Sequence, residues 1–377
     1  MCRTTWILLP ALGLILCASS AQAINWNDIA VGTDAGINGG SVFTLKRDSL
    51  DNASPVATQN PAINQGAIAD VGFQTAGTPQ PPNTPPGTIG GGPTAPLETV
   101  VWLTTSGVIT NANANRPADK VLNSEILPGF FGSDLTVLGD DTVFFGGSVP
   151  NNGQIRSSGL DMVNGTPATG DGVIDSVWQK IPSDNVAIAF ISAGVGTLGV
   201  RDGDGTTVGA DVALPAFPVD VDAYRQDPTL VVALADNTLS VRDGLSLAEL
   251  NSTSVGAGDI VAISVLSDRS TAVALFDGTD SLIEIYDQDL NFVSDSGMLF
   301  DGVEITAMDN QNTIDTLVVG DTTGLIQVLD STNFGVLLSR DLGDGAITAI
   351  TVNAPEPATI ALLVLAAAAA PLRRRVA

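Results

Sequence analysis

The chain has 377 residues, of which 44% are hydrophobic and 15% charged, with no histidine and two cysteines. The lack of histidine excludes Ser-His-Asp and Cys-His catalysis, imidazole metal ligands and a histidine general base. Cys2 and Cys17 both lie near the N-terminus, so the rest of the chain forms neither a disulfide nor a thiolate zinc site. With 41 acidic and 15 basic residues the formal net charge is −26, and we expect no nucleic-acid partner because such a chain repels phosphate backbones.

Residues 1–23 have the pattern of a secretory signal peptide. Arg3 precedes an apolar run from about Trp6 to Cys17, and the small residues Ala21 and Ala23 flank the expected cleavage site. The sequence therefore predicts a signal helix that is removed after residue 23. The remaining chain has no cysteine, which suits a protein outside the cytoplasm that does not depend on disulfides.

The first part of the body, from residue 24, reads as strands and turns. Short runs rich in Val, Ile, Leu and Thr are separated by Asp-Gly, Gly-Asp and Ser-Asp, and no stretch has a sustained helical period. At its start, NDIAVGTDAG matches the second strand of a unit and GGSVFTLKRDSL matches the third, but no segment there matches the first strand. Units follow near Ala67, Ser133 and Val173. The Pro- and Gly-rich stretch at 77–96 is expected to be a loop inserted between two strands of one unit.

From Val219 onward the sequence repeats every 41 to 43 residues. Units start at Val219, Ile260 and Val303, and a lone first strand starts at Ala346. Each unit holds four expected strands, and the third ends on an aspartate at Asp202, Asp243, Asp287 and Asp330.

This ending resembles the Trp-Asp of WD-repeat blades with the tryptophan lost, although the Gly-His dipeptide of that family is absent. The fold class expected is therefore all-β: a β-propeller spanning residues 24–354, with four-stranded blades. The C-terminal strand is expected to pair with the N-terminal blade, which closes the ring and leaves no long exposed edge. The unit count is seven, with six or eight left open because the first three units are degenerate.

Aspartate and glycine crowd the junction into each unit. A ring of carboxylates there would suit Ca²⁺, so Asp171, Asp259, Asp301 and Asp344 are weak metal candidates. Asp202-Gly-Asp204 and Asp171-Gly-Val-Ile-Asp175 are also partial matches to a calcium loop. The alternative is that Asp-Gly is an ordinary turn dipeptide. No cofactor is expected apart from this calcium possibility, and no catalytic residues are identified.

The last segment, residues 355–377, combines an extended tripeptide, an apolar stretch and a basic end. These are Pro355-Glu356-Pro357, residues 358–372 and Arg373-Arg374-Arg375. The pattern predicts a hydrophobic helix that enters the membrane with its positive end on the cytoplasmic side. As a helix the apolar stretch is about 22 Å long, shorter than the roughly 30 Å of a bilayer core.

The order of these three parts resembles the PEP-CTERM sorting signal. The resemblance implies recognition by an exosortase-type membrane protease, transient insertion in the inner membrane, and cleavage near the tripeptide with release or surface attachment. A plain C-terminal membrane anchor is the alternative.

The expected function is that of a secreted structural or binding protein of the cell surface or extracellular matrix. Association with exopolysaccharide is implied by the PEP-CTERM resemblance alone, and other surface proteins are possible partners. No catalysis is expected. The alternative is an extracellular propeller hydrolase or lyase that uses Asp or Glu with Ca²⁺, because glycosidases need only a pair of carboxyl groups.

Overall fold

The structure is a computed structural model of the whole chain. It describes residues 29–352 except for 35–38, 47–48, 51, 54–65, 75–98, 114–120, 128, 140, 151–152, 161, 180–184, 225–226, 298 and 312–315. The expected signal peptide, the Pro- and Gly-rich loop and the C-terminal sorting segment lie outside the described residues.

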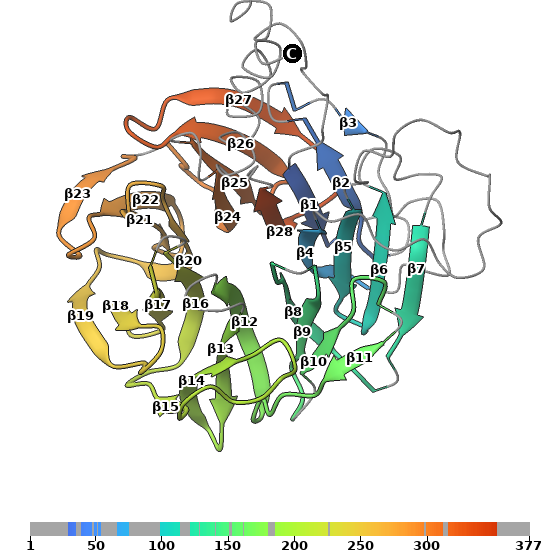
Figure 1. Cartoon of the computed structure of the whole chain (residues 1–377). Coiled ribbons are helices and arrows are strands. Elements are labelled where there is room, and N and C mark those ends of the chain that lie inside the picture. Colours follow the sequence, from blue (N-terminus) through green and yellow to red (C-terminus); the bar gives the residue numbers. More distant parts are fainter. Residues whose placement is uncertain are drawn as a thin grey trace, which may run out of the picture.

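Strands of the described residues form seven four-stranded antiparallel sheets arranged as a ring (Figure 1). From the channel outwards, blade 1 contains β28 (Ile347–Val352), β1 (Ile29–Thr33), β2 (Val42–Leu45) and β3 (Asn52–Ala53). Blade 2 contains β4 (Ile68–Gln74), β5 (Thr99–Thr104), β6 (Val108–Asn113) and β7 (Val121–Ile126). Blade 3 contains β8 (Gly132–Val137), β9 (Val143–Gly147), β10 (Gln154–Arg156) and β11 (Val163–Gly165).

The other four blades follow the same order. Blade 4 contains β12 (Gly172–Gln179), β13 (Asn185–Ser192), β14 (Val195–Arg201) and β15 (Val212–Ala213). Blade 5 contains β16 (Pro218–Ala223), β17 (Thr229–Leu234), β18 (Thr238–Asp243) and β19 (Glu249–Ser254). Blade 6 contains β20 (Asp259–Val265), β21 (Thr271–Phe276), β22 (Ser281–Tyr286) and β23 (Phe292–Asp295). Blade 7 contains β24 (Ile305–Gln311), β25 (Thr316–Asp321), β26 (Leu325–Asp330) and β27 (Val336–Asp341).

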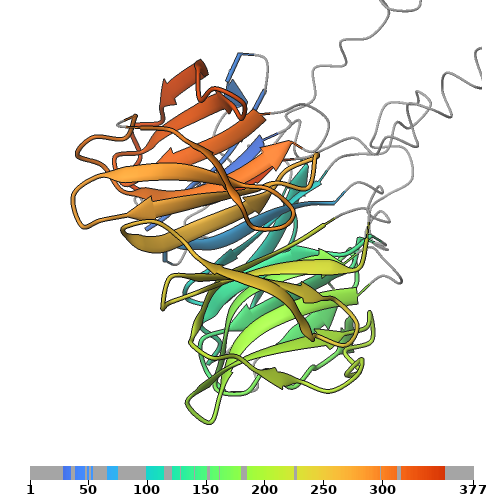
Figure 2. The same ribbon diagram turned by 90° about the vertical axis from the view of Figure 1, so that its left-hand side faces the viewer.

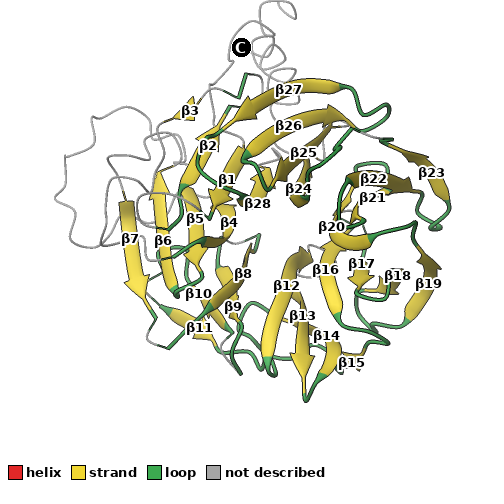
Figure 3. Cartoon of the chain, turned by 180° about the vertical axis from the view of Figure 1, so that it is seen from behind, coloured by secondary structure: helices red, strands yellow, loops and turns green. Residues whose placement is uncertain are grey.

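The prediction of a seven-bladed, all-β propeller is confirmed. Viewed from behind, the described chain consists of strands and loops (Figure 3), and within it no helix is long and apolar enough to cross a membrane. The gap 75–98 separates β4 from β5, so the Pro- and Gly-rich stretch falls between two strands of one blade, as expected.

Ring closure joins the two ends of the described chain. β1 pairs with β28 in antiparallel register, with Ile29 opposite Val352. The blue strand β1 therefore lies beside the red strand β28 in Figure 1. Because blade 1 takes its innermost strand from the other end of the chain, the ring cannot close until both ends have folded.

The hydrophobic core of the described residues is divided among the blade interfaces. Seven clusters of buried side chains occur, and each combines residues of two neighbouring blades. The second strand of a blade packs against neighbouring blades on both of its faces. In β5 and β9, for example, every residue is buried, instead of buried and exposed residues alternating. Trp102 on β5 is completely buried. Figure 2 shows the body from its rim, where the outermost strands lie.

Every blade has a β-bulge between its first and second strands. One residue of the first strand is skipped in the pairing, as Ala69 is in blade 2 and Ile174 in blade 4. A bulge bends its strand and changes where the following side chain points. The residue directly after each bulge is among those that line the central cavity.

The aspartates that end the third strands cap the turn into the fourth strand. Asp287 Oδ1 accepts hydrogen bonds from the backbone N–H groups of Asp289 and Asn291, at 2.9 and 2.8 Å. Asp202, Asp243 and Asp330 accept equivalent bonds in their own blades. The recurring aspartate therefore has a local structural role, in keeping with the tendency of Asp to bond the backbone two residues on.

Candidate functional site

The innermost strands surround a cavity of about 760 Å³ along the axis of the ring. All seven of them, β4, β8, β12, β16, β20, β24 and β28, contribute residues to its wall. Among the described lining residues the titratable groups are all aspartates. The cavity is thus an acidic chamber without a basic counter-charge in its described wall.

Two layers of side chains line this cavity, because residues two apart on a strand share a face. We call the residues directly after the bulges the first layer: Asp70, Asp134, Asp175, Asp220, Ala262, Ala307 and Ala349. The second layer, two residues further on, contains Gly72, Thr136, Val177, Asp222, Ser264, Asp309 and Thr351. Four adjacent blades therefore supply aspartate in the first layer, and the other three supply alanine.

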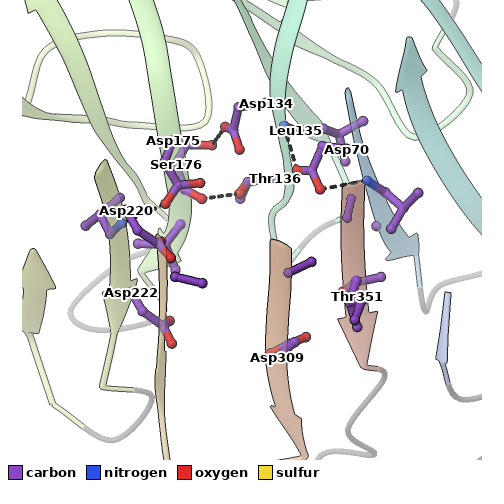
Figure 4. A pocket seen from close by; sticks show the side chains of 18 of the residues that line it. Asp70, Asp134, Leu135, Thr136, Asp175, Ser176, Asp220, Asp222, Asp309 and Thr351 are labelled. Atoms are coloured by element: carbon purple, nitrogen blue, oxygen red, sulfur yellow. Dashed lines mark hydrogen bonds between the residues drawn. The ribbon is translucent and has the colours of Figure 1, made fainter. Parts of the chain in front are cut away.

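The first-layer aspartates connect neighbouring blades. Asp70 Oδ2 accepts a hydrogen bond from the backbone N–H of Leu135 in the next blade, at 2.9 Å. Asp175 makes the same bond with Val221, at 2.7 Å. Figure 4 shows Asp134, Asp175 and Asp220 on successive strands at the wall of the cavity.

The remaining two first-layer aspartates also bond across a blade boundary. Asp220 Oδ2 accepts from the backbone N–H of Ile263 at 2.7 Å. Asp134 instead accepts a hydrogen bond from the hydroxyl of Ser176. The boundaries from blade 2 to blade 6 are therefore each bridged by one first-layer carboxyl group.

Second-layer aspartates repeat this arrangement one step along the strand. Asp222 Oδ2 accepts from the N–H of Val265, and Asp309 Oδ2 accepts from that of Val352, both at 2.7 Å. Asp309 thus ties blade 7 to β28, the strand that closes the ring. Its other oxygen accepts from the N–H of Asn310 on its own strand, also at 2.7 Å.

Burial changes the acidity of the first layer. Desolvation raises the pKa of Asp70 to about 7. It also raises the pKa values of Asp134, Asp175 and Asp220 well above their usual range, with the negative charge of the neighbouring aspartate as the second cause. Both effects favour the protonated form, in which a carboxyl group donates as well as accepts hydrogen bonds.

The calcium candidates of the sequence lie elsewhere. Asp171, Asp259, Asp301 and Asp344 stand at the start of the innermost strands of four different blades. Asp171 Oδ2 accepts a hydrogen bond from the N–H of Gly194, and Asp344 Oδ2 accepts one from the hydroxyl of Thr33. Within the part of the chain that the structure describes, no three Asp or Glu side chains are grouped as a metal site. Calcium binding at these residues stays a prediction.

The partial calcium loops are also separated by the fold. Asp202 Oδ1 accepts from the N–H groups of Asp204 and Thr206, which makes a turn of the kind described above. Asp171 directly precedes β12, the innermost strand of blade 4, whereas Asp175 lies beyond the bulge and lines the cavity. The sorting residues Pro355, Glu356, Pro357, Arg373, Arg374 and Arg375, and the cleavage residues Ala21 and Ala23, lie outside the described residues.

Sequence reasoning missed the channel aspartates as a set. Their signal is an aspartate in the middle of a first strand, as in IADV, SDLT, VDVD and AMDN. Such a residue reads as the exposed face of an alternating strand. It becomes a channel residue only when the blades are arranged around an axis.

Comparison with known proteins yields the fold alone. No protein-family model and no curated protein matches this sequence. The structure is similar to the crystal structure of the computationally designed Ika8 protein, with a TM-score of 0.57 and 14% sequence identity. The similarity covers 85% of this chain and 90% of that chain.

Proposed function

We propose that this protein is a secreted binding or structural module of the cell surface or extracellular matrix, without catalytic activity. An N-terminal signal peptide and a PEP-CTERM-like segment would deliver it, and an exosortase-type protease would process the latter. Support comes from the order of sequence patterns at the two ends and from a closed propeller between them.

The order of sequence patterns at the two ends carries this proposal, and the pairing of Ile29 with Val352 brings the two ends of the described propeller together. Both residues end the described propeller within one blade, so the two sorting segments are attached to adjacent strands. β28 begins near Asp344 and ends at Val352, so Val352 lies on the face opposite the junction loops. A propeller attached through its C-terminal segment would therefore present the junction face, with Asp171, Asp259 and Asp301, away from the membrane.

Delivery can be tested by fractionating cells that express the full chain. Wild-type protein is expected at the surface or in the medium, with a shorter C-terminus than the precursor. Replacing Arg373, Arg374 and Arg375 with alanine should leave an unprocessed precursor in the inner membrane. An Arg340→Ala variant, which changes a basic residue of the propeller, serves as the control. A cytoplasmic location of the wild-type chain would contradict the proposal.

Binding can be tested by co-sedimentation of the protein with exopolysaccharide of the producing organism, with Ca²⁺ or with a chelator. Calcium-dependent binding that is lost when Asp171, Asp259, Asp301 and Asp344 are changed to asparagine would assign the junction face as the binding surface. A matched variant with four exposed aspartates of other loops changed, Asp204, Asp236, Asp268 and Asp289, should keep binding. No binding under either condition would point to protein partners instead.

The alternative, a hydrolase or lyase, is favoured by one observation. Buried carboxyl groups with raised pKa values line a cavity, and a glycosidase needs one protonated and one ionised carboxyl group. However, the channel carboxyl groups already accept hydrogen bonds from the backbone of the next blade. Turnover of any member of a polysaccharide panel with Ca²⁺ present, abolished by Asp134→Asn, would establish this alternative.

A further inference from the structure

The first-layer aspartates form a continuous row across neighbouring blades. The position directly after the bulge on the innermost strands of blades 2, 3, 4 and 5 is occupied by Asp70, Asp134, Asp175 and Asp220. After the larger effect of burial, the negative charge of one neighbouring aspartate raises the pKa of each of Asp134, Asp175 and Asp220. Ionisation of one member of the row therefore opposes ionisation of the next.

The same carboxyl groups bridge the blades through the backbone. Asp70, Asp175 and Asp220 each accept a hydrogen bond from a backbone N–H of the following blade. Electrostatic repulsion between these carboxyl groups therefore pushes apart the strands that carry them, which are β4, β8, β12 and β16. Ionisation of the row and the packing of these four blades are thus coupled.

Other charges near the row are also negative. The second layer contributes Asp222 and Asp309, and the turn after β8 contributes Asp141 to the cavity wall. The strands directly behind, β5, β9, β13 and β17, contain no titratable residue, and β20 and β28 place none in the described wall. Nothing among these groups offers a positive charge to compensate an ionised row.

We propose that Asp70, Asp134, Asp175 and Asp220 form a buried row whose ionisation makes the propeller pH-responsive. The boundaries between blades 2 and 6 are tightest when the row is protonated, and they loosen as its protons leave. This inference rests on the channel alone and is independent of the proposed surface function.

The direction of the effect follows from proton linkage. The folded row binds more protons than the unfolded chain, because burial and neighbouring negative charge raise its pKa values. Stability falls with rising pH wherever the folded state binds more protons. The row's contribution is fully present below about pH 4 and is lost as pH rises through about 7 and above.

The test is urea unfolding of the full-length protein between about pH 5 and about pH 9. The wild-type midpoint should fall as pH rises. In a variant with all four aspartates changed to asparagine, the fall should shrink to less than half, because asparagine keeps an acceptor oxygen and does not ionise. A control changes four exposed aspartates, Asp204, Asp259, Asp289 and Asp301, by the same net charge and should keep the wild-type fall. Equal falls in all three proteins would overturn the proposal.

A second measurement does not depend on the folding of the fourfold variant. The infrared carbonyl band of protonated carboxylic acid should be present in the wild-type protein at neutral pH and should disappear at alkaline pH. The single variant Asp134→Asn should weaken this band, whereas Asp301→Asn should leave it unchanged. Absence of the band from wild-type protein at neutral pH would overturn the proposal.

Discussion

Asp220 and Ile263 stand one repeat apart, and the carboxyl group of the first accepts a 2.7 Å hydrogen bond from the backbone of the second. Asp222 and Val265 repeat the contact one step further along the same two strands. Both pairs are 43 residues apart. The sequence period is therefore the spacing at which an acidic side chain meets the backbone of the next blade.

The ring-closing carboxyl group provides the first prediction. Asp309→Ala removes the acceptor for the N–H groups of Val352 and Asn310. Leaving buried donors without a partner should lower the free energy of unfolding by about 1–3 kcal/mol. Urea unfolding measures this loss. Asp309→Asn, which retains an oxygen acceptor, should lose less, and a larger loss for asparagine than for alanine would contradict the assignment.

A close approach between blades provides the second. Gly146 on β9 lies so near β12 that an added Cβ would be 2.4 Å from the Cβ of Val173. Gly146→Ala should therefore destabilise the protein by about 1–3 kcal/mol, because the packed interface has no room for the methyl group. Thermal unfolding measures the change. Gly203→Ala, at a position with no atoms near an added Cβ, is the control and should differ little from wild type.

A strained turn provides the third. Ala193, between β13 and β14, has a φ of 51°, in the left-handed region that an L residue with a side chain disfavours. Ala193→Gly should raise the free energy of unfolding by a few tenths to about 1 kcal/mol, the strain relieved less the entropy of glycine. The same change at Ala213, an exposed strand residue, should lower it. Stabilisation at both positions would show that strain is not the cause.

Ring closure provides the fourth. A chain truncated after Asp341 lacks β28 and leaves β1 and β24 without their neighbour. Because each interface cluster needs two blades, this chain should lose cooperative unfolding and aggregate through its exposed strand edge. A chain truncated after residue 353, which retains β28, is the control. A soluble, cooperatively unfolding shorter chain would show that closure is dispensable.

The fifth prediction concerns the exposed turn aspartates. Their contribution to stability changes with pH in the opposite direction to that of the channel aspartates. Hydrogen bonds from Asn291 lower the pKa of Asp287. A depressed folded-state pKa contributes stability above the usual value of about 4, and this contribution is lost as pH falls. Asp287→Asn should therefore reduce the loss of stability between about pH 5 and about pH 3. Urea midpoints measure it, with Asp301→Asn as the control. If Asp287→Asn loses as much stability as the wild type between these pH values, the hydrogen bonds of the turn do not favour the ionised form of Asp287.

Local patterns were sufficient for the arrangement of the strands. The aspartate after each third strand and the period near 43 identified the blades from residue 219 onward because turn chemistry is local to a few residues. The unpaired first strand after Ala346 and the missing one before Ile29 predicted closure, since an open sheet edge is unfavourable. The degenerate early units left six or eight blades open, and the structure decided for seven.

Candidate site residues were harder to predict from sequence. Each of the metal candidates Asp171, Asp259, Asp301 and Asp344 stands beside a glycine, and the fold places them in four different blades. Asp70 and Asp134 stand in different sequence contexts and have no shared motif. What makes them a set is a bulge one residue earlier, and a bulge depends on how the second strand pairs.

The sequence by itself determined the all-β class, the repeat and the closure of the ring, because each depends on residue types at short or regular spacing. The tertiary structure decided between six, seven and eight blades and brought four aspartates from residues 70 to 220 into one buried row. Burial and the charge of neighbours exist only after the blades close around an axis, and those two effects raise the pKa values of these four aspartates.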